Sequence, residues 1–491
     1  MMTVPADQSA LGVAADPGHV MASGGDGRIV LDPATGLNRY LSAPRPSAVL
    51  AYASSTANDI SPQAYAQVAR LLEEMGPDPS PQVYAERLER LRARIRAAYD
   101  IAPDVPIVFA PSGTDLEYVA LACVAGRGSG GTHNILLGAD EVGTGCIHSA
   151  HGRYFAEQTA LGLPTRAGEP VRGFERVSVE LVDVPVRDAQ GRVRPSAEIT
   201  AAMSESIVGA TAAGRHTIVH VVHGSKTGLI LPALDDLDRL LAAHGSDVTI
   251  VVDACQARIT SEAVTSYLQR GAIVFITGSK FMGGPPFSGF ALIPPALAAS
   301  AAPLPQGLET LFRRAEWPTA WPGREPLPDT ANAGLLMRLE ASIFELERFQ
   351  TLPPGAVTRM ILAFHAAVRS EIIDATPARR VAPYPPGDRE EAEIHPVEMR
   401  TLSTLDLSAF NGGAPFEDAQ RWHKALIGHG VRLGQPVKCV KLPDGPWGAT
   451  LRIGLTMWQL ADRAHFDEAA LAASFADDMA RVREALVAVS G

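Results

Sequence analysis

The residue best suited to covalent chemistry in this sequence is Lys280, the last residue of a Thr-Gly-Ser-Lys segment. It follows an apolar run at residues 272–277 and precedes a segment rich in glycine and proline. Partial burial lowers the pKa of a lysine amine and makes it nucleophilic, as Schiff-base chemistry requires. An ordinary loop lysine is the alternative, but only five of the 43 basic residues are lysines. Few other positions, among them Lys226, are available for amine chemistry.

Three other polar segments also follow apolar runs. Residues 111–115, Pro-Ser-Gly-Thr-Asp, combine small residues and hydroxyls at an expected helix start, where free backbone N–H groups suit a phosphate. Asp253 ends the run 248–253 and is placed to pair with a cationic ring nitrogen. The loop 223–228 contains Lys226, the competing amine. Each segment has a structural alternative, because the first two also suit helix N-caps and the third also suits a turn.

The order of these segments resembles that of fold-type I pyridoxal-phosphate (PLP) enzymes, and residues 217–293 most resemble the class V aminotransferase and cysteine desulfurase family. The resemblance implies that Lys280 forms the internal aldimine and moves protons at the substrate Cα. It implies that Asp253 pairs with the pyridinium nitrogen, which makes the cofactor an electron sink. It also implies that Gln256 and Ser225 flank the ring and reach the cofactor's O3′.

The same resemblance implies how the phosphate, the partner subunit and the substrate are held. The implied phosphate-binding residues are Gly113, Thr114, Asp115, Thr277 and Ser279. Thr330 looks like the family's residue that reaches the phosphate of the partner subunit, which implies a homodimer with shared active sites. Arg452 matches the arginine that clamps a substrate α-carboxylate, a task for which a bidentate guanidinium is well suited.

The sequence departs from the family's pattern at three places. Residues 140–145 contain no histidine where the family has one that stacks on the cofactor ring, and His148 lies a few positions further on. Ser279 stands where the family often has a histidine before the lysine. The loop 432–436 lacks the nucleophilic cysteine of the desulfurases, although Cys439 is nearby. These differences argue against sulfur transfer from cysteine and leave the reaction type open.

Hydrophobic patterning predicts the elements that must position these residues. Short apolar runs alternate with helical patterns, which predicts an α/β fold with a mostly parallel, seven-stranded type of sheet covered by helices. The expected strands are residues 106–110, 134–138, 217–223, 248–253, 272–277 and 289–293. The last strand follows its predecessor too closely for a helical crossover, which is compatible with an antiparallel direction. Ligands of such sheets bind at the carboxyl ends of the strands, where the polar segments lie.

The chain is predicted to have three parts. An irregular N-terminal arm, suited to packing on a partner, covers residues 1–45, a large PLP-binding α/β domain covers 46–330, and a small α+β domain covers 331–491. The helical patterns are at residues 82–100, 115–125, 151–161, 234–243, 261–269, 333–349, 357–373, 417–428 and 466–487. The small domain is also expected to contain strands at residues 399–407 and 449–455.

Composition argues against several classes of function. The net charge of −11 disfavours a nucleic-acid-binding face. No apolar run is long enough to span a membrane, and the start lacks the basic and apolar regions of a signal peptide, so we expect a cytoplasmic protein with no membrane partner. The four scattered cysteines lack metal-ligand spacing, and no metal site is expected.

The sequence therefore predicts a PLP-dependent enzyme, similar to class V aminotransferases, that acts on an α-amino acid or a close relative through an external aldimine. Transamination and elimination by a lyase mechanism are equally favoured, and cysteine desulfurase-like sulfur removal ranks third. A non-catalytic binding or regulatory protein of the same fold is the alternative from another class. The joint presence of Asp253, Lys280 and Arg452 argues against that alternative.

Overall fold

The centre of the molecule is an eight-stranded sheet, seen in a computed structural model that describes residues 16–139, 141–143, 145–174, 178–384, 401–443 and 445–491. The strand order is β2-β9-β8-β7-β5-β3-β4, and β6 pairs with β5. The strands are β2 (Ile107–Ala110), β3 (Thr132–Leu137), β4 (Glu180–Val184), β5 (His216–His223), β6 (Ile230–Leu231), β7 (Val248–Asp253), β8 (Ile273–Thr277) and β9 (Gly289–Leu292). β9 is antiparallel to β8 and β2, whereas the pairs from β8 to β4 are parallel. The predicted mostly parallel sheet, with an antiparallel last strand, is confirmed.

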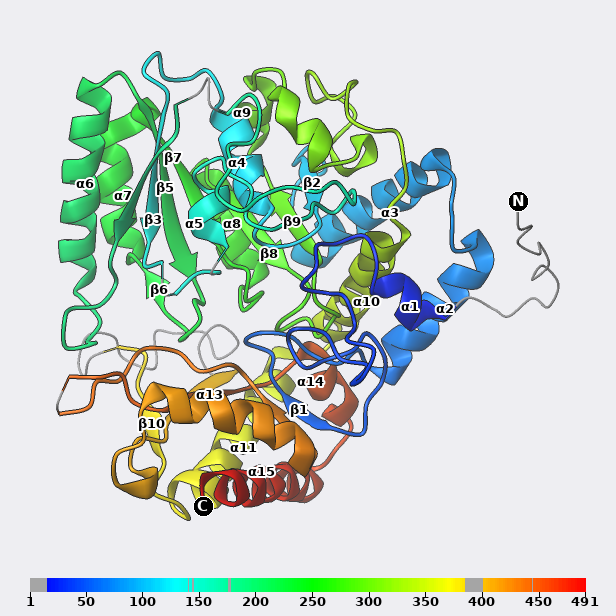
Figure 1. The fold of residues 1–491 in the computed structure, drawn as a ribbon, viewed down its shortest axis with the longest axis vertical. Helices are drawn as coiled ribbons and strands as arrows, with labels where there is room; N and C mark the ends of the chain where they lie inside the picture. Colours follow the sequence, from blue (N-terminus) through cyan, green and yellow to red (C-terminus); the bar gives the residue numbers. More distant parts are fainter. Residues whose placement is uncertain (1–15, 140, 144, 175–177, 385–400, 444) are drawn as a thin grey trace, which may run out of the picture.

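Helices cover both faces of this sheet (Figure 1). They include α4 (Leu116–Val124), α6 (Ser196–Ala212), α7 (Leu234–His244) and α8 (Ser261–Gln269). Successive side chains of a strand point to opposite faces. Ile250 and Val252 of β7 therefore lie in the core cluster with α6, α7 and α8, whereas Val251 lies in the cluster with α4. Because both faces are buried, the strands are continuously apolar, which is why the sequence pattern identifies them.

A smaller antiparallel sheet, with strand order β10-β11-β13, forms the C-terminal part of the chain. Its elements are β10 (Arg379–Val381), β11 (Leu402–Asp406), β13 (Thr450–Gly454), α11 (Pro354–Val368), α13 (Phe416–Ala425), α14 (Met457–Arg463) and α15 (Glu468–Ser490). β1 (Leu50–Tyr52) pairs in parallel with β12 (Val431–Leu433), so the chain crosses between the two parts early. The domain boundaries at residues 45 and 330 stay a prediction.

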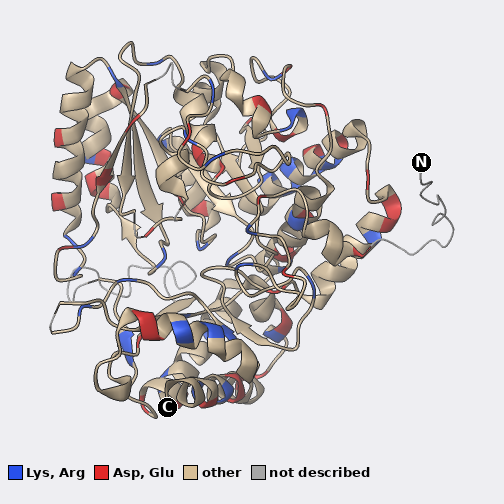
Figure 2. Cartoon of the chain, in the orientation of Figure 1, with Lys and Arg blue, Asp and Glu red and all other residues tan. Residues whose placement is uncertain are grey.

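Helix α13 shows how charges are placed along an exposed element (Figure 2). Its first turn carries Glu417 and Asp418, and its last turn carries Lys424, whereas His423 of that turn is buried and burial lowers its pKa to about 4. This order opposes the helix dipole at each end and is favourable for the helix. Among the described residues, no helix is both long and apolar enough to cross a membrane.

The segment between β3 and β5 differs from its prediction. The helix expected at residues 151–161 is wrong, because the described residues there form turns after the short α5 (Cys146–Ser149). Gly152 adopts a φ of 69°, a left-handed conformation that ends the helix. β4 and α6 were not predicted. β4 is a partly exposed edge strand without a long apolar run, and α6 has a weak apolar stripe among small residues.

The described part of the N-terminal arm, residues 16–45, is mostly irregular, as predicted, and packs on the chain's own α10 (Ala333–Gln350). Arg338 of α10 is fully buried and connects the arm to the sheet domain. Its Nε donates to the Phe287 carbonyl at 2.6 Å, while Nη1 and Nη2 donate to the carbonyls of Met21 and Gly24 at 2.7 and 3.1 Å. The arm is therefore docked in a defined position, drawn in dark blue in Figure 1.

Replacing Arg338 with methionine is expected to lower the free energy of unfolding by about 3 to 5 kcal/mol, because several buried carbonyls lose their donors together. Equilibrium denaturation in urea measures the change. Arg369→Met is the control, since that side chain is 81 % exposed and its removal is expected to cost less than about 0.5 kcal/mol. Equal losses in the two variants would contradict the anchoring role of Arg338.

Candidate active site

A cavity of about 260 Å³ opens at the carboxyl ends of β5, β7 and β8 and is lined by residues from the sheet domain, the C-terminal part and the arm. Of the predicted site residues, only Asp115 and Thr330 do not line it. Those that do are Gly113, Thr114, Ser225, Asp253, Gln256, Thr277, Ser279, Lys280 and Arg452. The open α/β sheet thus brings polar segments that are far apart in sequence to one edge.

Lys280 and Asp253 enter the cavity after the neighbouring parallel strands β8 and β7. The Asn58 side-chain amide donates to the Lys280 carbonyl at 2.6 Å, which fixes the backbone beneath the amine. One carboxylate oxygen of Asp253 accepts the Cys255 backbone N–H at 3.0 Å. An amine and an oriented carboxylate are therefore held in the same cavity.

A second acid, Glu117, lies beside Asp253 and was not anticipated. Its Oε2 is 3.3 Å from Nε2 of His220, and both side chains are buried. Burial and the Asp253 charge raise the pKa of Glu117 well above its ordinary value, whereas burial lowers the pKa of His220 to about 4. Burial thus favours the neutral form of each group. The one sequence signal was a glutamate inside the otherwise apolar run of α4.

The Ser-Gly-Thr-Asp loop before α4 is packed tightly against β8. A Cβ at Gly113 would lie 2.9 Å from Cγ2 of Thr277, so glycine permits this close approach. Asp115 points away from the cavity lining. Its Oδ2 accepts from the Ser112 hydroxyl at 2.5 Å, its N–H donates back to Ser112 at 3.3 Å, and burial raises its pKa to about 7. Asp115 therefore braces the loop, and its N–H is already engaged.

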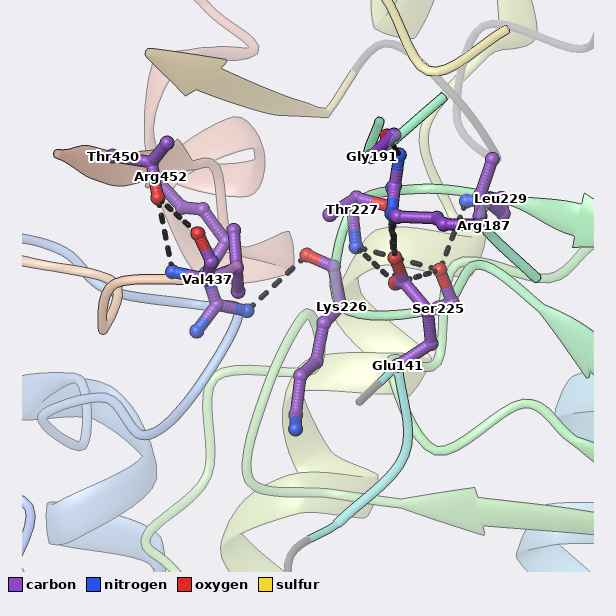
Figure 3. Close-up of polar contacts among 10 residues, drawn as sticks. All are labelled: Glu141, Arg187, Gly191, Ser225, Lys226, Thr227, Leu229, Val437, Thr450 and Arg452. Atoms are coloured by element: carbon purple, nitrogen blue, oxygen red, sulfur yellow. Dashed lines mark hydrogen bonds and ion pairs between the residues drawn. The ribbon is translucent and has the colours of Figure 1, made fainter. Parts of the chain in front are cut away.

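Ser225 is part of a buried network centred on Glu141 (Figure 3). The Ser225 hydroxyl donates to Glu141 at 2.7 Å, and Arg187 and Thr227 donate at 2.8 and 2.9 Å. Burial alone would raise the pKa of Glu141, but the Arg187 charge and these hydrogen bonds outweigh it and lower the pKa. Ser225 gives its proton to Glu141, and its oxygen accepts the Leu229 backbone N–H at 3.1 Å, so the hydroxyl is engaged as both donor and acceptor.

The segment in which the family's stacking histidine is missing contributes an aliphatic side chain instead. Val142 and Gly143 line the cavity, and Val142 is buried. Asp140 and Thr144 of the same segment lie outside the described residues. His148 does not line the cavity. The described residues of this segment thus present Val142 and Gly143 to the cavity, and none of them is a histidine.

Arg452 on β13 reaches the cavity from the C-terminal part (Figure 3). It donates to the carbonyls of Gln435 and Lys226 at 2.8 and 3.2 Å and to the Thr56 hydroxyl at 3.2 Å. Burial lowers its pKa to about 10, so the guanidinium stays charged near pH 7. Lys226 also lines the cavity, and burial followed by the Arg452 charge lowers its pKa to about 8. Lys226 and Lys280, the two lysines considered for amine chemistry, thus line the same cavity.

The arm contributes two lining residues that sequence reasoning missed, Arg28 and Tyr40. The arm has no periodicity or motif, so no sequence signal indicated them. Thr330 is exposed and lies outside the cavity, and its contact with a partner subunit stays a prediction.

Solved structures share this architecture, although no protein-family model and no curated protein sequence matches the chain. A NifS-like protein aligns with a TM-score of 0.55 and 12% identity over 89% of this chain and 99% of its own. The cysteine desulfurase CsdA from Escherichia coli gives 0.55 and 16% over 90% and 95%. A structure of serine palmitoyltransferase (SPT) with a PLP internal aldimine gives 0.51 and 13% over 89% and 88%.

These matches show that the chain has the fold of the fold-type I PLP-dependent enzymes. The resemblance read from residues 217–293 is confirmed at this level, because a NifS-like protein and a cysteine desulfurase are among the structures that share the fold.

Proposed function

We propose that this protein is a PLP-dependent enzyme that acts on an α-amino acid or a close relative. The observation that carries the proposal is the convergence of Lys280 and Asp253 in one cavity at the carboxyl edge of a fold-type I sheet. The structures that share this fold include serine palmitoyltransferase with a PLP internal aldimine and a C-DES mutant with glycine covalently linked to the PLP cofactor. A protein that only binds a partner has no need for an amine and an oriented carboxylate in the same cavity.

The residues of the cavity fit PLP. Asp253 offers a carboxylate to a pyridinium nitrogen, and Lys280 offers an amine for covalent attachment. Gly113, Thr114 and Ser279 supply small or hydroxyl-bearing groups near the start of α4, where a phosphate is favoured. Val142 supplies an aliphatic surface in the segment where the family's ring-stacking residue is expected. The cavity thus offers residues suited to the ring nitrogen and aldehyde, to the phosphate and to the ring face of the cofactor.

When bound, the protonated pyridine ring of PLP supplies an electron sink for charge that develops at the substrate Cα. Asp253 keeps a proton on the ring nitrogen through its negative charge. Lys280 would take the proton from the substrate Cα as a general base. Arg452 attracts the substrate carboxylate, with most of its N–H groups already held by protein oxygens.

The reaction is proposed to be transamination or elimination, ahead of sulfur removal. Cys439 does not line the cavity, and burial raises its pKa to about 12, which keeps it a thiol. Cys146 and Cys255 do line the cavity, but burial raises the pKa of each well above its ordinary value. Sulfur transfer requires a thiolate nucleophile, so none of these residues suits it.

We also propose a homodimer with shared active sites. Exposed Thr330, which is outside its own subunit's cavity, supports this arrangement.

The test of the proposed function is an absorbance spectrum of the purified full chain with PLP, recorded before and after borohydride and followed by a panel of α-amino acids. We expect a visible band that bleaches irreversibly on reduction. At least one amino acid should change the band and release a ketoacid or ammonia. A chain that gains no band with added PLP would overturn the proposal, and a band that no amino acid changes would favour the non-catalytic alternative.

Arg452→Met is expected to weaken amino-acid binding by about 10- to 100-fold, because one charge-assisted contact to the carboxylate is lost. The apparent dissociation constant is read from the spectral change during titration with the amino acid identified by the panel. The control ligand is the amine that has the same side chain but no carboxylate. It should bind more weakly than the amino acid, and its dissociation constant should be the same in the wild type and the variant. An equal loss for both ligands would assign Arg452 a structural role only.

A further inference from the structure

Arg28 stands out in the cavity because it belongs to the irregular arm and not to the sheet domain. Its side chain is 19 % exposed. The guanidinium carbon lies 4.9 Å from the ring centroid of Phe155 and 4.6 Å from that of Phe287. Such cation–π contacts favour a guanidinium that is held in one place. The arm thus delivers a fixed positive charge to the cavity.

Asp26 determines which edge of the Arg28 guanidinium remains available. Its carboxylate accepts from Nε at 2.8 Å and from Nη2 at 2.6 Å, which occupies one edge in a bidentate pair. The remaining donors face the loop before α4. Nη2 is 3.4 Å from the Ser112 hydroxyl and Nη1 is 3.4 Å from the Thr114 hydroxyl. These distances exceed those of strong hydrogen bonds, so this edge is only weakly satisfied by the loop.

The position of Arg28 is built into the fold. Arg338 donates to the Met21 and Gly24 carbonyls, and the Asn332 side-chain amide donates to the Gly24 carbonyl at 2.9 Å. Gly24 adopts a φ of 64°, and a Cβ there would lie 1.8 Å from the Asn332 side chain. The turn before Arg28 is therefore fixed against α10, which brings the guanidinium to the loop.

We propose that Arg28 is a phosphate-binding residue of the cofactor site, acting with the hydroxyl of Thr114. The inference rests on the proposed function, because PLP supplies the phosphate. A doubly charged phosphate favours a fork of guanidinium donors beside a helix N-terminus. Asp26 orients the guanidinium of Arg28. Its negative charge reduces but does not cancel the attraction between Arg28 and a phosphate. The other facing carboxyl, Asp115, is bonded to Ser112 and has a raised pKa of about 7.

The experiment compares PLP with pyridoxal, which has the same ring and aldehyde but no phosphate. Arg28→Met is expected to raise the dissociation constant for PLP by about 10- to 100-fold, in line with the loss of a charge-assisted hydrogen bond. The dissociation constant for pyridoxal should change by less than about 2-fold. Both constants are measured by absorbance titration of the cofactor-free full chain. Arg39→Met, which removes an exposed arginine of the same arm, is the matched control and should change neither constant.

Arg28→Lys covers the case in which the methionine variant does not fold. It keeps a positive charge beside Asp26 but lacks the fork, so we expect an intermediate loss for PLP and none for pyridoxal. Equal losses for the two ligands, or no loss for either, would overturn the phosphate contact while leaving the proposed function intact. A wild-type chain that binds neither ligand would overturn both. The two failures are therefore distinguishable.

Discussion

Replacing Lys280 with alanine is expected to abolish covalent attachment of PLP and to lower kcat/KM on the order of 10³-fold or more. The variant loses both the amine that bonds to the cofactor and the base that moves the Cα proton. Borohydride reduction followed by peptide mass spectrometry checks the first effect. The cofactor mass should be found on the peptide that contains Lys280 in the wild type and on no peptide of the variant. Steady-state kinetics with the amino acid identified by screening checks the second effect.

Lys226→Ala is the informative control, because Lys226 lines the same cavity and its pKa is lowered to about 8 by burial and by Arg452. This variant should still carry the reducible adduct on Lys280. An adduct found on Lys226 in the wild type would reverse the assignment of the two amines. Such a result would also move the reactive centre from the end of β8 to the loop after β5.

Asp253→Asn is expected to lower kcat by about 10²- to 10³-fold. The neutral amide cannot keep a proton on the ring nitrogen, and a loss of this size corresponds to a barrier higher by about 3 to 4 kcal/mol. Glu117 does not replace the charge, since burial, the larger cause of its raised pKa, remains when Asp253 is replaced, and burial lowers the pKa of His220 to about 4. The dissociation constant for PLP should rise as well, because one contact to the ring is weakened.

The measurement is steady-state kinetics at saturating PLP, which separates slower chemistry from weaker cofactor binding. Asp238→Asn is the matched control, because that aspartate is 48 % exposed on α7 and pairs with Arg270 far from the cavity lining. It should leave kcat within about 2-fold of the wild type. A kcat of Asp253→Asn close to that of the wild type would exclude Asp253 as the partner of the ring nitrogen.

The sequence predicted those strands whose burial leaves a local pattern of apolar residues. β5, β7 and β8 are covered on both faces and therefore appear as continuous apolar runs, which mark their positions and indicate parallel pairing. The residues directly after these strands had to meet at one edge, whatever the details of the helices. Together with the resemblance of these segments to those of fold-type I PLP enzymes, this position implied that Asp253 and Lys280 belong to one site.

Elements without such patterns were missed. β4 is an edge strand that is half exposed, so its residues need not be apolar. The apolar residues at 151–161, which had suggested a helix, instead pack within a folded loop. Phe155 packs against Tyr118 of α4 and beneath Arg28, and these contacts do not require helical spacing. Periodicity cannot distinguish side chains buried by a folded loop from those buried by a helix.

By itself, the sequence determined the class of fold, the edge of the sheet at which the site lies and nine of the residues that line it, because burial leaves a pattern among neighbours in the chain. Only the tertiary structure decided which lining residues arrive from elsewhere. Arg28 reaches the cavity because Arg338 and Asn332 dock the arm on α10. Arg452, which the family resemblance had already implied, reaches it from β13. The position of Arg28 depends on contacts between segments hundreds of residues apart, and such contacts leave no local pattern in the sequence.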